Sequence, residues 1–285
     1  MKYQELFEFG KSKLAAAGIA EADLDARLLL EAVCGTKKHD LIINSDKEVT
    51  PGQAKSYVNH IDKRKNRIPL QYILGEQEFM GLRFIVTPDT LIPRQDTETL
   101  VEEVMRHLHD GQSILDMCTG TGCILLSLLH YSNHCAGTGV DISEAALAIA
   151  QQNEEQIRRF KRQGEKVKPI HWIKSDLFAE ISGRFDIIVA NPPYIPTQVI
   201  DTLMPEVRDH EPRLALDGKE DGYYFYRKLI DQSSQYLSPG GMLYLEGGSD
   251  QAEEITALMN NSGFYDITVI KDLAGNDRVI YGRIR

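Results

Sequence analysis

Cysteine is scarce in this chain of 285 residues, and no two of its four cysteines form a CxxC pair. Zinc sites and disulfide frameworks depend on such spacings, so we expect neither, and we expect no metal of any kind. The sequence therefore predicts reduced thiols. The cysteines are Cys34, Cys118, Cys123 and Cys135.

Long apolar runs are missing as well. No stretch approaches the length of about 20 apolar residues that a membrane-spanning helix requires. The first residues scatter Glu5, Glu8, Lys11 and Lys13 among their apolar positions, and so lack the apolar core of a signal peptide. We expect a cytoplasmic protein without a membrane segment.

Positive charge is in deficit. Lys and Arg total 32 against 42 for Asp and Glu, which gives a formal net charge of -10. Such a balance repels polyanions at long range, so nucleic acid is a disfavoured partner. Two basic runs, residues 60–67 and 158–168, lie in polar, helix-like stretches, and we interpret both as solvated faces.

The hydrophobic pattern changes twice along the chain. Residues 1–75 carry helical spacing only, with breaks at Gly18, Gly35 and the Pro51-Gly52 pair. Residues 76–95 suggest two strands that turn near Met80-Gly81, followed by a connector that prolines stiffen. We therefore expect a helical domain over residues 1–75 that docks a substrate, a β-hairpin connector over 76–95 and a catalytic domain over 96–285.

Strands and helices alternate within the third segment. This alternation predicts an α/β domain with a mostly parallel, doubly wound, Rossmann-like sheet whose ligand lies at the carboxyl ends of the strands. The expected strands are Ser113 to Met117, Ala136 to Val140, Ile170 to Ile173, Phe185 to Ala190, Met242 to Glu246, Tyr265 to Ile270 and Val279 to Ile284. The expected helices between them include Glu144 to Gln152, Tyr223 to Leu237 and Gln251 to Asn261.

A glycine-rich turn follows the first strand of that domain. Glycines there let the backbone approach a ligand closely, and the following helix offers free N–H groups. Such a turn serves a dinucleotide as well as a methyl donor. Asp116, just before the turn, would sit badly beside a pyrophosphate but suits the cationic, phosphate-free methionine end of S-adenosylmethionine. The turn consists of Cys118, Thr119, Gly120, Thr121 and Gly122.

Acidic residues also end the next two strands. Asp141 can accept hydrogen bonds from both ribose hydroxyls, although it can also cap the helix that starts at Ser143. Asp176 can bond an adenine amine while Leu177 packs on the ring, although Asp176 can also be a simple loop acid. Both positions favour a nucleoside-containing ligand.

The apolar run Phe185 to Ala190 stops abruptly at Asn191, Pro192, Pro193 and Tyr194. Proline cannot continue a strand ladder, and it biases Asn191 toward an extended conformation. The Asn191 side-chain oxygen and the Pro192 carbonyl can together accept both hydrogens of a planar NH₂ group, against which Tyr194 can pack. The alternative is a proline-rich turn without chemistry.

An amide or aromatic amine nitrogen attacks carbon poorly because its lone pair is delocalised. Two acceptors favour a more tetrahedral nitrogen, and holding it about 3 to 3.5 Å from a sulfonium methyl group supplies near-attack alignment. We therefore predict methyl transfer, with Asn191, Pro192 and Tyr194 as catalytic residues and Asn191 to Tyr194 as the substrate site.

The motifs DMCTGTG, VDIS, SDLF and NPPYIP resemble those of the protein-glutamine methyltransferases that modify release factors, the HemK/PrmC family. The likeness extends along nearly the whole chain. It includes Leu74-Gly75-Glu76 with Phe79, Leu91 to Arg94, Glu211 to Leu216, Glu220 to Gly222, Pro239 to Gly241 and Lys271 to Gly275. The NPPY tetrapeptide alone is shared with adenine-amine nucleic-acid methyltransferases.

The resemblance implies a monomeric enzyme with S-adenosylmethionine as cofactor and class 1 peptide chain release factors as protein substrates. The modified group would be the amide nitrogen of the glutamine in their Gly-Gly-Gln loop. The implied cofactor contacts are Cys118 to Gly122, Asp141, Asp176, Leu177 and Asn191.

One position departs from the family. Cys118 stands where a glycine is usual, and a small side chain fits there if its backbone φ is negative. Three alternatives remain, namely a ribosomal-protein glutamine methyltransferase, a nucleic-acid adenine methyltransferase and a non-catalytic binding module.

Overall fold

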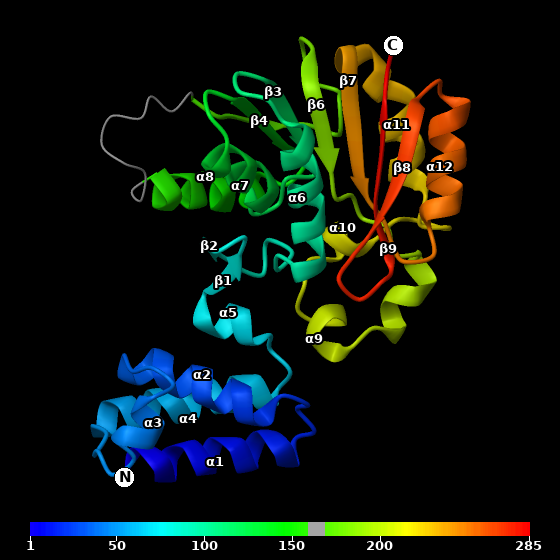
Figure 1. The fold of residues 1–285 in the computed structure, drawn as a ribbon. Helices are drawn as coiled ribbons and strands as arrows, with labels where there is room; N and C mark the ends of the chain where they lie inside the picture. Colours follow the sequence, from blue (N-terminus) through cyan, green and yellow to red (C-terminus); the bar gives the residue numbers. More distant parts are fainter. Residues whose placement is uncertain (159–168) are drawn as a thin grey trace. The chain divides into compact units, whose positions relative to one another are not determined.

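The computed structural model describes residues 1–158 and 169–285 (Figure 1). The chain divides into two compact units. The first unit contains residues 1–75 and 204–210, and the second contains residues 76–203 and 211–285. Among the described residues, no helix is long and apolar enough to cross a membrane.

Helices alone form the first unit, as the spacing in residues 1–75 predicts. Thr50 and Gln53 form a capping box before the helix that opens with Pro51, and Gly35 ends another helix in the left-handed conformation. Leu6, Leu14, Leu29, Leu30, Tyr57 and Ile61 are among the residues of its core. The helices are α1 (Tyr3–Ala16), α2 (Ala22–Cys34), α3 (Asp40–Ile43), α4 (Pro51–Lys65), α5 (Leu70–Leu74) and α9 (Pro205–Arg208).

A buried ion cluster in this unit corrects the interpretation of residues 60–67 as a solvated face. The Arg64 guanidinium donates to Asp25 at 2.7 Å and to Glu206 at 3.1 Å, and Arg64 is only 9% exposed. Arg67 also donates to Glu206, at 3.2 Å. The interpretation fails at these two arginines because their acidic partners come from other parts of the chain.

Of the second basic run, only Arg158 belongs to the described residues, and there it donates to Glu154 at 2.7 Å. The remaining residues of that run, 159–168, lie outside the described part of the chain.

The second unit contains a mixed seven-stranded sheet with the order β5-β4-β3-β6-β7-β9-β8. The first five strands in that order are parallel, and β9 runs antiparallel to both β7 and β8. All seven strands occur where the sequence predicts them, which confirms the Rossmann-like fold. They are β3 (Ser113–Met117), β4 (Ala136–Asp141), β5 (His171–Lys174), β6 (Phe185–Ala190), β7 (Leu237–Glu246), β8 (Tyr265–Lys271) and β9 (Asp277–Arg283).

Helices cover both faces of this sheet (Figure 1). Because side chains alternate along a strand, Ile187 and Val189 of β6 pack with α6 to α8, whereas Ile188 and Ala190 pack with α11 and α12. The helices are α6 (Glu98–His107), α7 (Cys123–Tyr131), α8 (Glu144–Arg158), α11 (Tyr224–Tyr236) and α12 (Ala252–Asn261).

The expected hairpin is present as β1 (Glu76–Phe79) and β2 (Leu82–Ile85), which turn at Met80 and Gly81. The Asn153 side chain of α8 fixes the hairpin, since it both donates to and accepts from the backbone of Ile85. Three short helices complete the unit, η1 (Gln95–Thr97), η2 (Thr197–Thr202) and α10 (Arg213–Leu216).

The strand order reverses at β3. The chain passes from β3 to β4 on one side, whereas β6 pairs with the opposite edge of β3. Connections that leave the sheet in opposite directions open a crevice at the carboxyl ends of the two strands. The glycine-rich turn and the Asn191 segment therefore begin side by side, because Met117 pairs with Ala190.

Candidate active site

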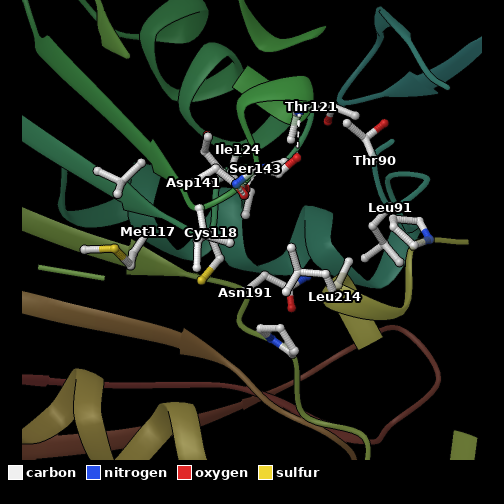
Figure 2. Close-up of a pocket in the computed structure, with 18 of the residues that line it drawn as sticks. Thr90, Leu91, Met117, Cys118, Thr121, Ile124, Asp141, Ser143, Asn191 and Leu214 are labelled. Atoms are coloured by element: carbon white, nitrogen blue, oxygen red, sulfur yellow. Dashed lines mark hydrogen bonds between the residues drawn. The ribbon is translucent and has the colours of Figure 1, made fainter. Parts of the chain in front are cut away.

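A cavity lies at the carboxyl ends of β3, β4 and β6 (Figure 2). The turns after these strands form one wall. The opposite wall comes from residues 88–91, 93 and 94 and from Pro212, Leu214 and Ala215. The motifs that the sequence places on separate strands thus line one space.

The turn after β3 is shaped by left-handed backbone at Gly120 (φ 54°) and Gly122 (φ 78°). A Cβ atom on Gly120 would meet nothing within 4 Å, so this glycine leaves open space in the cavity. A Cβ on Gly122 would lie 3.0 Å from the Trp172 ring and 3.2 Å from Ala150. Gly120 therefore leaves room in the cavity, and Gly122 lets α7 pack closely on its neighbours.

The backbone of Cys118 does not have the negative φ that the sequence analysis required for a side chain at this position. Its φ is 61°, in the left-handed region, and not negative. A non-glycine residue there costs about 1 to 2 kcal/mol. The Thr119 N–H donates to the Val140 carbonyl at 2.9 Å and holds the next residue in place. The cysteine therefore keeps the backbone path of a glycine.

The Cys118 thiol is a poor nucleophile. Burial raises its pKa well above the usual value, and the negative charges of Asp141, Asp116 and Asp176 raise it further. Asp141 and Asp176, which line the cavity, make this end of it electronegative, which suits a cation.

Asp116 is fully buried beneath the turn, and the cavity lining among the described residues does not include it. Its Oδ2 accepts from the Thr119 hydroxyl at 2.6 Å and from the Leu125 N–H at 3.3 Å, while Oδ1 has no partner. Burial raises the pKa of Asp116 to about 7, against the hydrogen bonds that lower it. Asp116 thus holds the turn in shape, and its direct contact with a ligand stays a prediction.

Asp141 lines the cavity and fastens the glycine turn to β4. Its Oδ2 accepts from the Gly120 N–H at 2.9 Å, and its Oδ1 accepts from the Ser143 N–H at 2.9 Å. The helix cap is Ser143 itself, whose hydroxyl accepts from the Ala146 N–H. Each carboxylate oxygen can accept a further bond, so both remain available to a pair of hydroxyls.

Asp176 and Leu177 also line the cavity. Asp176 is exposed, whereas Leu177 is buried and has a left-handed φ of 50°. The Ser175 hydroxyl donates to the Leu177 carbonyl at 2.7 Å and stabilises this conformation. A strained backbone of this kind is typical of a binding site.

Of the segment after β6, Asn191 and Pro193 belong to the described lining, whereas Pro192 and Tyr194 do not. The Asn191 Nδ2 lies 3.4 Å from the Thr97 hydroxyl. Tyr194 packs against the core, and burial raises its pKa to about 12. The phenol therefore keeps its proton near neutral pH.

The backbone of this segment is clamped by residues that the sequence did not identify as functional. The Ile195 N–H donates to the Leu216 carbonyl at 3.0 Å, and the Gly218 N–H donates to the Ile195 carbonyl at 2.8 Å. A Cβ on Gly218 would lie 2.7 Å from Tyr194 Cα. The Gln251 amide donates to the Tyr194 carbonyl at 3.2 Å. The only signal was the family-like segments Glu211 to Leu216 and Glu220 to Gly222.

An ion pair connects the two segments of the opposite wall, Leu91 to Arg94 and Glu211 to Leu216. Arg94 donates to both oxygens of Glu211, at 2.6 and 2.7 Å, and the Glu211 side chain is 1% exposed. The pair joins the 88–94 connector to the Pro212–Ala215 wall.

Two family models match the chain. The model of the PrmC N-terminal domain covers residues 5–75, and that of the methyltransferase small domain covers residues 95–207. The release factor glutamine methyltransferase of Geobacter sulfurreducens is 41% identical over 282 residues, which are 99% of this chain and 96% of that protein. The protein of the same name from Moorella thermoacetica is 42% identical over 93% of both chains.

A solved methyltransferase from Pyrococcus furiosus shares the fold. It has a TM-score of 0.52 and 18% identity, and the match covers 71% of this chain and 89% of that one.

Proposed function

The chain belongs to the family of release factor glutamine methyltransferases, and we propose that it methylates the side-chain amide nitrogen of a glutamine in a class 1 release factor. The glutamine would be that of the Gly-Gly-Gln motif. The methyl donor would be S-adenosyl-L-methionine, and the enzyme would act in the cytoplasm as a monomer.

One observation carries the proposal. Asn191 and residues Cys118 to Thr121 of the glycine-rich turn line the same cavity, because their strands pair through Met117 and Ala190. An acceptor for an NH₂ group would thus lie across the cavity from the turn that would hold a methyl donor.

The residues of the cavity fit S-adenosylmethionine. Open space beside Gly120 admits a ligand, and Asp141 can accept from two ribose hydroxyls. Leu177 supplies an apolar surface for an aromatic ring, and Asp176 an acceptor for its amine. When bound, the cofactor would supply a methyl group on a positively charged sulfur, which the nearby carboxylates complement.

Asn191 and Pro192 would activate the amide nitrogen. If the Asn191 Oδ1 and the Pro192 carbonyl accept both N–H groups, the lone pair is directed toward the donor and held in near-attack alignment. The methyl group would pass to this nitrogen, the sulfur would leave as a neutral thioether, and the nitrogen would lose one of its two protons. The clamp of Gly218 and Gln251 on Tyr194 would keep these acceptors fixed.

The first unit would dock the release factor. Every described residue that lines the cavity belongs to the second unit, so the helical unit has no chemistry of its own there. Hydrogen exchange on the intact protein tests this role. Addition of a release factor should slow exchange within residues 1–75, and protection confined to the second unit would refute docking.

The reaction itself is tested with labelled methyl donor and purified release factor, ribosomes or DNA. Label should enter the release factor alone, and mass spectrometry should place one methyl group on the glutamine of Gly-Gly-Gln. A release factor with that glutamine replaced by alanine is the control. Label in ribosomal protein or in DNA, with none in the release factor, would establish one of the alternatives instead.

A further inference from the structure

A buried carboxyl group lies behind Asn191. Glu246 ends β7 and is 2% exposed. β6 and β7 are parallel, and Ala190 pairs with Leu245, so Asn191 and Glu246 are the next residues in register. Since Ala190 and Leu245 point into the core with α11 and α12, the following side chains point to the opposite face.

Thr97 of η1 meets both side chains on that face. Its hydroxyl accepts from the Asn191 Nδ2 at 3.4 Å, and both Thr97 and Asn191 lie close enough to the carboxyl group of Glu246 to lower its pKa. Thr97 is 2% exposed, and the buried Oε2 of Glu246 has no hydrogen-bond partner among the described residues. An ionised carboxyl group accepts hydrogen bonds and donates none.

These partners decide which way the Asn191 amide faces. The two ends of an amide differ only in that one donates and the other accepts, so the neighbouring groups determine its orientation. A carboxylate on one side requires the NH₂ end. The Oδ1 atom is then directed away from Glu246, toward the cavity that Asn191 lines.

We propose that Glu246 is a positioning residue that, directly and through Thr97, holds the Asn191 amide with its oxygen toward the substrate nitrogen. Glu246 itself is absent from the described lining of the cavity, so it acts through Asn191 and not on the substrate. The inference rests on the proposed function, because it assigns a role within that reaction.

The orientation depends on the charge of Glu246. A protonated carboxyl group can donate to the Asn191 oxygen and so stabilises the opposite, inactive orientation. Burial raises the pKa of Glu246 to about 7, against the Thr97 hydrogen bond and the positive charge of Arg278, which lower it. Catalysis should therefore fall as pH drops below 7.

The groups in contact with Glu246 do not account for such a transition, and Asp116, whose pKa is also about 7, is distinguished from Glu246 by the Thr97→Val variant below. Asp96 raises the Glu246 pKa through its charge, and Arg278 is held by Asp272 at 3.0 Å. Burial keeps the nearby phenols of Tyr194 and Tyr226 protonated, since it raises the pKa of each. Burial also raises the pKa of the Cys123 thiol to about 12.

Glu246→Gln is the first test, measured as single-turnover methylation of a release factor at pH values on both sides of 7. The new amide can donate to the Asn191 oxygen at every pH. We expect a rate about 10- to 100-fold lower, because Asn191 would then present its NH₂ end to the substrate for most of the time, and each tenfold fall corresponds to about 1.4 kcal/mol of barrier. The part of the pH dependence that comes from Glu246 should be lost, whereas any part that comes from Asp116, whose pKa is also about 7, should remain. Cofactor affinity by calorimetry should change less than about two-fold.

Glu103→Gln is the matched control. Glu103 of α6 is 4% exposed, and it pairs with Arg106 and His107. Loss of a buried carboxylate there should leave the rate and its pH dependence unchanged.

Thr97→Val gives a second readout that does not require the first variant to fold. The Thr97 hydrogen bond lowers the Glu246 pKa, so its removal should move the pH transition upward, and Thr97→Ser should restore it. Suppose that the wild-type protein methylates the release factor, but its rate shows no transition near pH 7 and Thr97→Val shifts none. That result would overturn the role of Glu246 and leave the proposed function intact. Failure of the wild-type protein to methylate any release factor would instead refute the proposed function.

Discussion

The carboxylate of Asp141 accepts the N–H of Gly120 at 2.9 Å, so the end of β4 holds the turn that follows β3. This bond places a residue expected to bind ribose in direct contact with the backbone expected to surround the methionine end. The contact with ribose and the contact with the methionine end should therefore depend on each other.

Asp141→Ala is expected to weaken S-adenosylmethionine binding without unfolding the protein. It removes an acceptor for two hydroxyls and releases the turn, and charge-assisted hydrogen bonds contribute about 1.5 to 3 kcal/mol each. Calorimetry measures the loss. Glu144→Ala is the control, since that side chain is 82% exposed nearby on α8. Unchanged affinity in a folded Asp141→Ala protein would refute the ribose role.

Cys118→Gly should stabilise the protein, or leave it unchanged, with cofactor affinity retained. Glycine removes a left-handed strain of about 1 to 2 kcal/mol but adds about 0.5 to 1 kcal/mol of unfolded-state entropy. Cys118→Val should destabilise it, because a branched side chain tolerates positive φ poorly. Thermal unfolding compares the three proteins. Equal melting temperatures for the valine and glycine variants would show that the backbone at position 118 is not strained.

Arg64→Ala should destabilise the first unit by about 3 to 5 kcal/mol, because it leaves the buried carboxylate of Asp25 without its partner. Denaturant unfolding measures the loss. Lys65→Ala, one residue away and exposed, should change the free energy of unfolding by less than about 0.5 kcal/mol. Similar effects for the two variants would show that the ion cluster is not important for stability.

The sequence predicted those features that depend on nearby residues. The strands of the sheet follow from short apolar runs such as Phe185 to Ala190, and the cavity from the residues that end them. The role of Glu246 did not follow, because it closes an apolar run and its partner Thr97 lies far away in the chain. The solvated-face interpretation failed at Arg64 for the same reason, since Glu206 is distant in sequence.

Local backbone conformation also could not be predicted from the sequence. The left-handed φ of Cys118 depends on bonds from neighbouring residues to β4, which come from tertiary structure. The clamp on Tyr194 likewise depends on pairing between segments that carry no chemistry of their own.

Asn191→Ala should lower the single-turnover rate by about a hundred- to a thousand-fold, the usual cost of one positioned hydrogen-bond partner. Affinity for the release factor should be nearly unchanged, because a protein partner is held by a much larger surface. A wild-type rate with methylation confined to the same glutamine would refute the acceptor role.

Asn191→Asp separates the acceptor role from the orientation that Glu246 imposes. A carboxylate at position 191 still accepts the substrate hydrogens, so this variant should retain more activity than Asn191→Ala. Beside Glu246, however, two carboxyl groups would share a proton, and the rate should rise only at higher pH. Adding Glu246→Gln removes that repulsion and supplies a donor. Glu246→Gln should therefore raise the methylation rate of the Asn191→Asp variant, whereas the same substitution should lower the rate of the wild-type protein. Equal effects of Glu246→Gln in both backgrounds would show that the two side chains act independently.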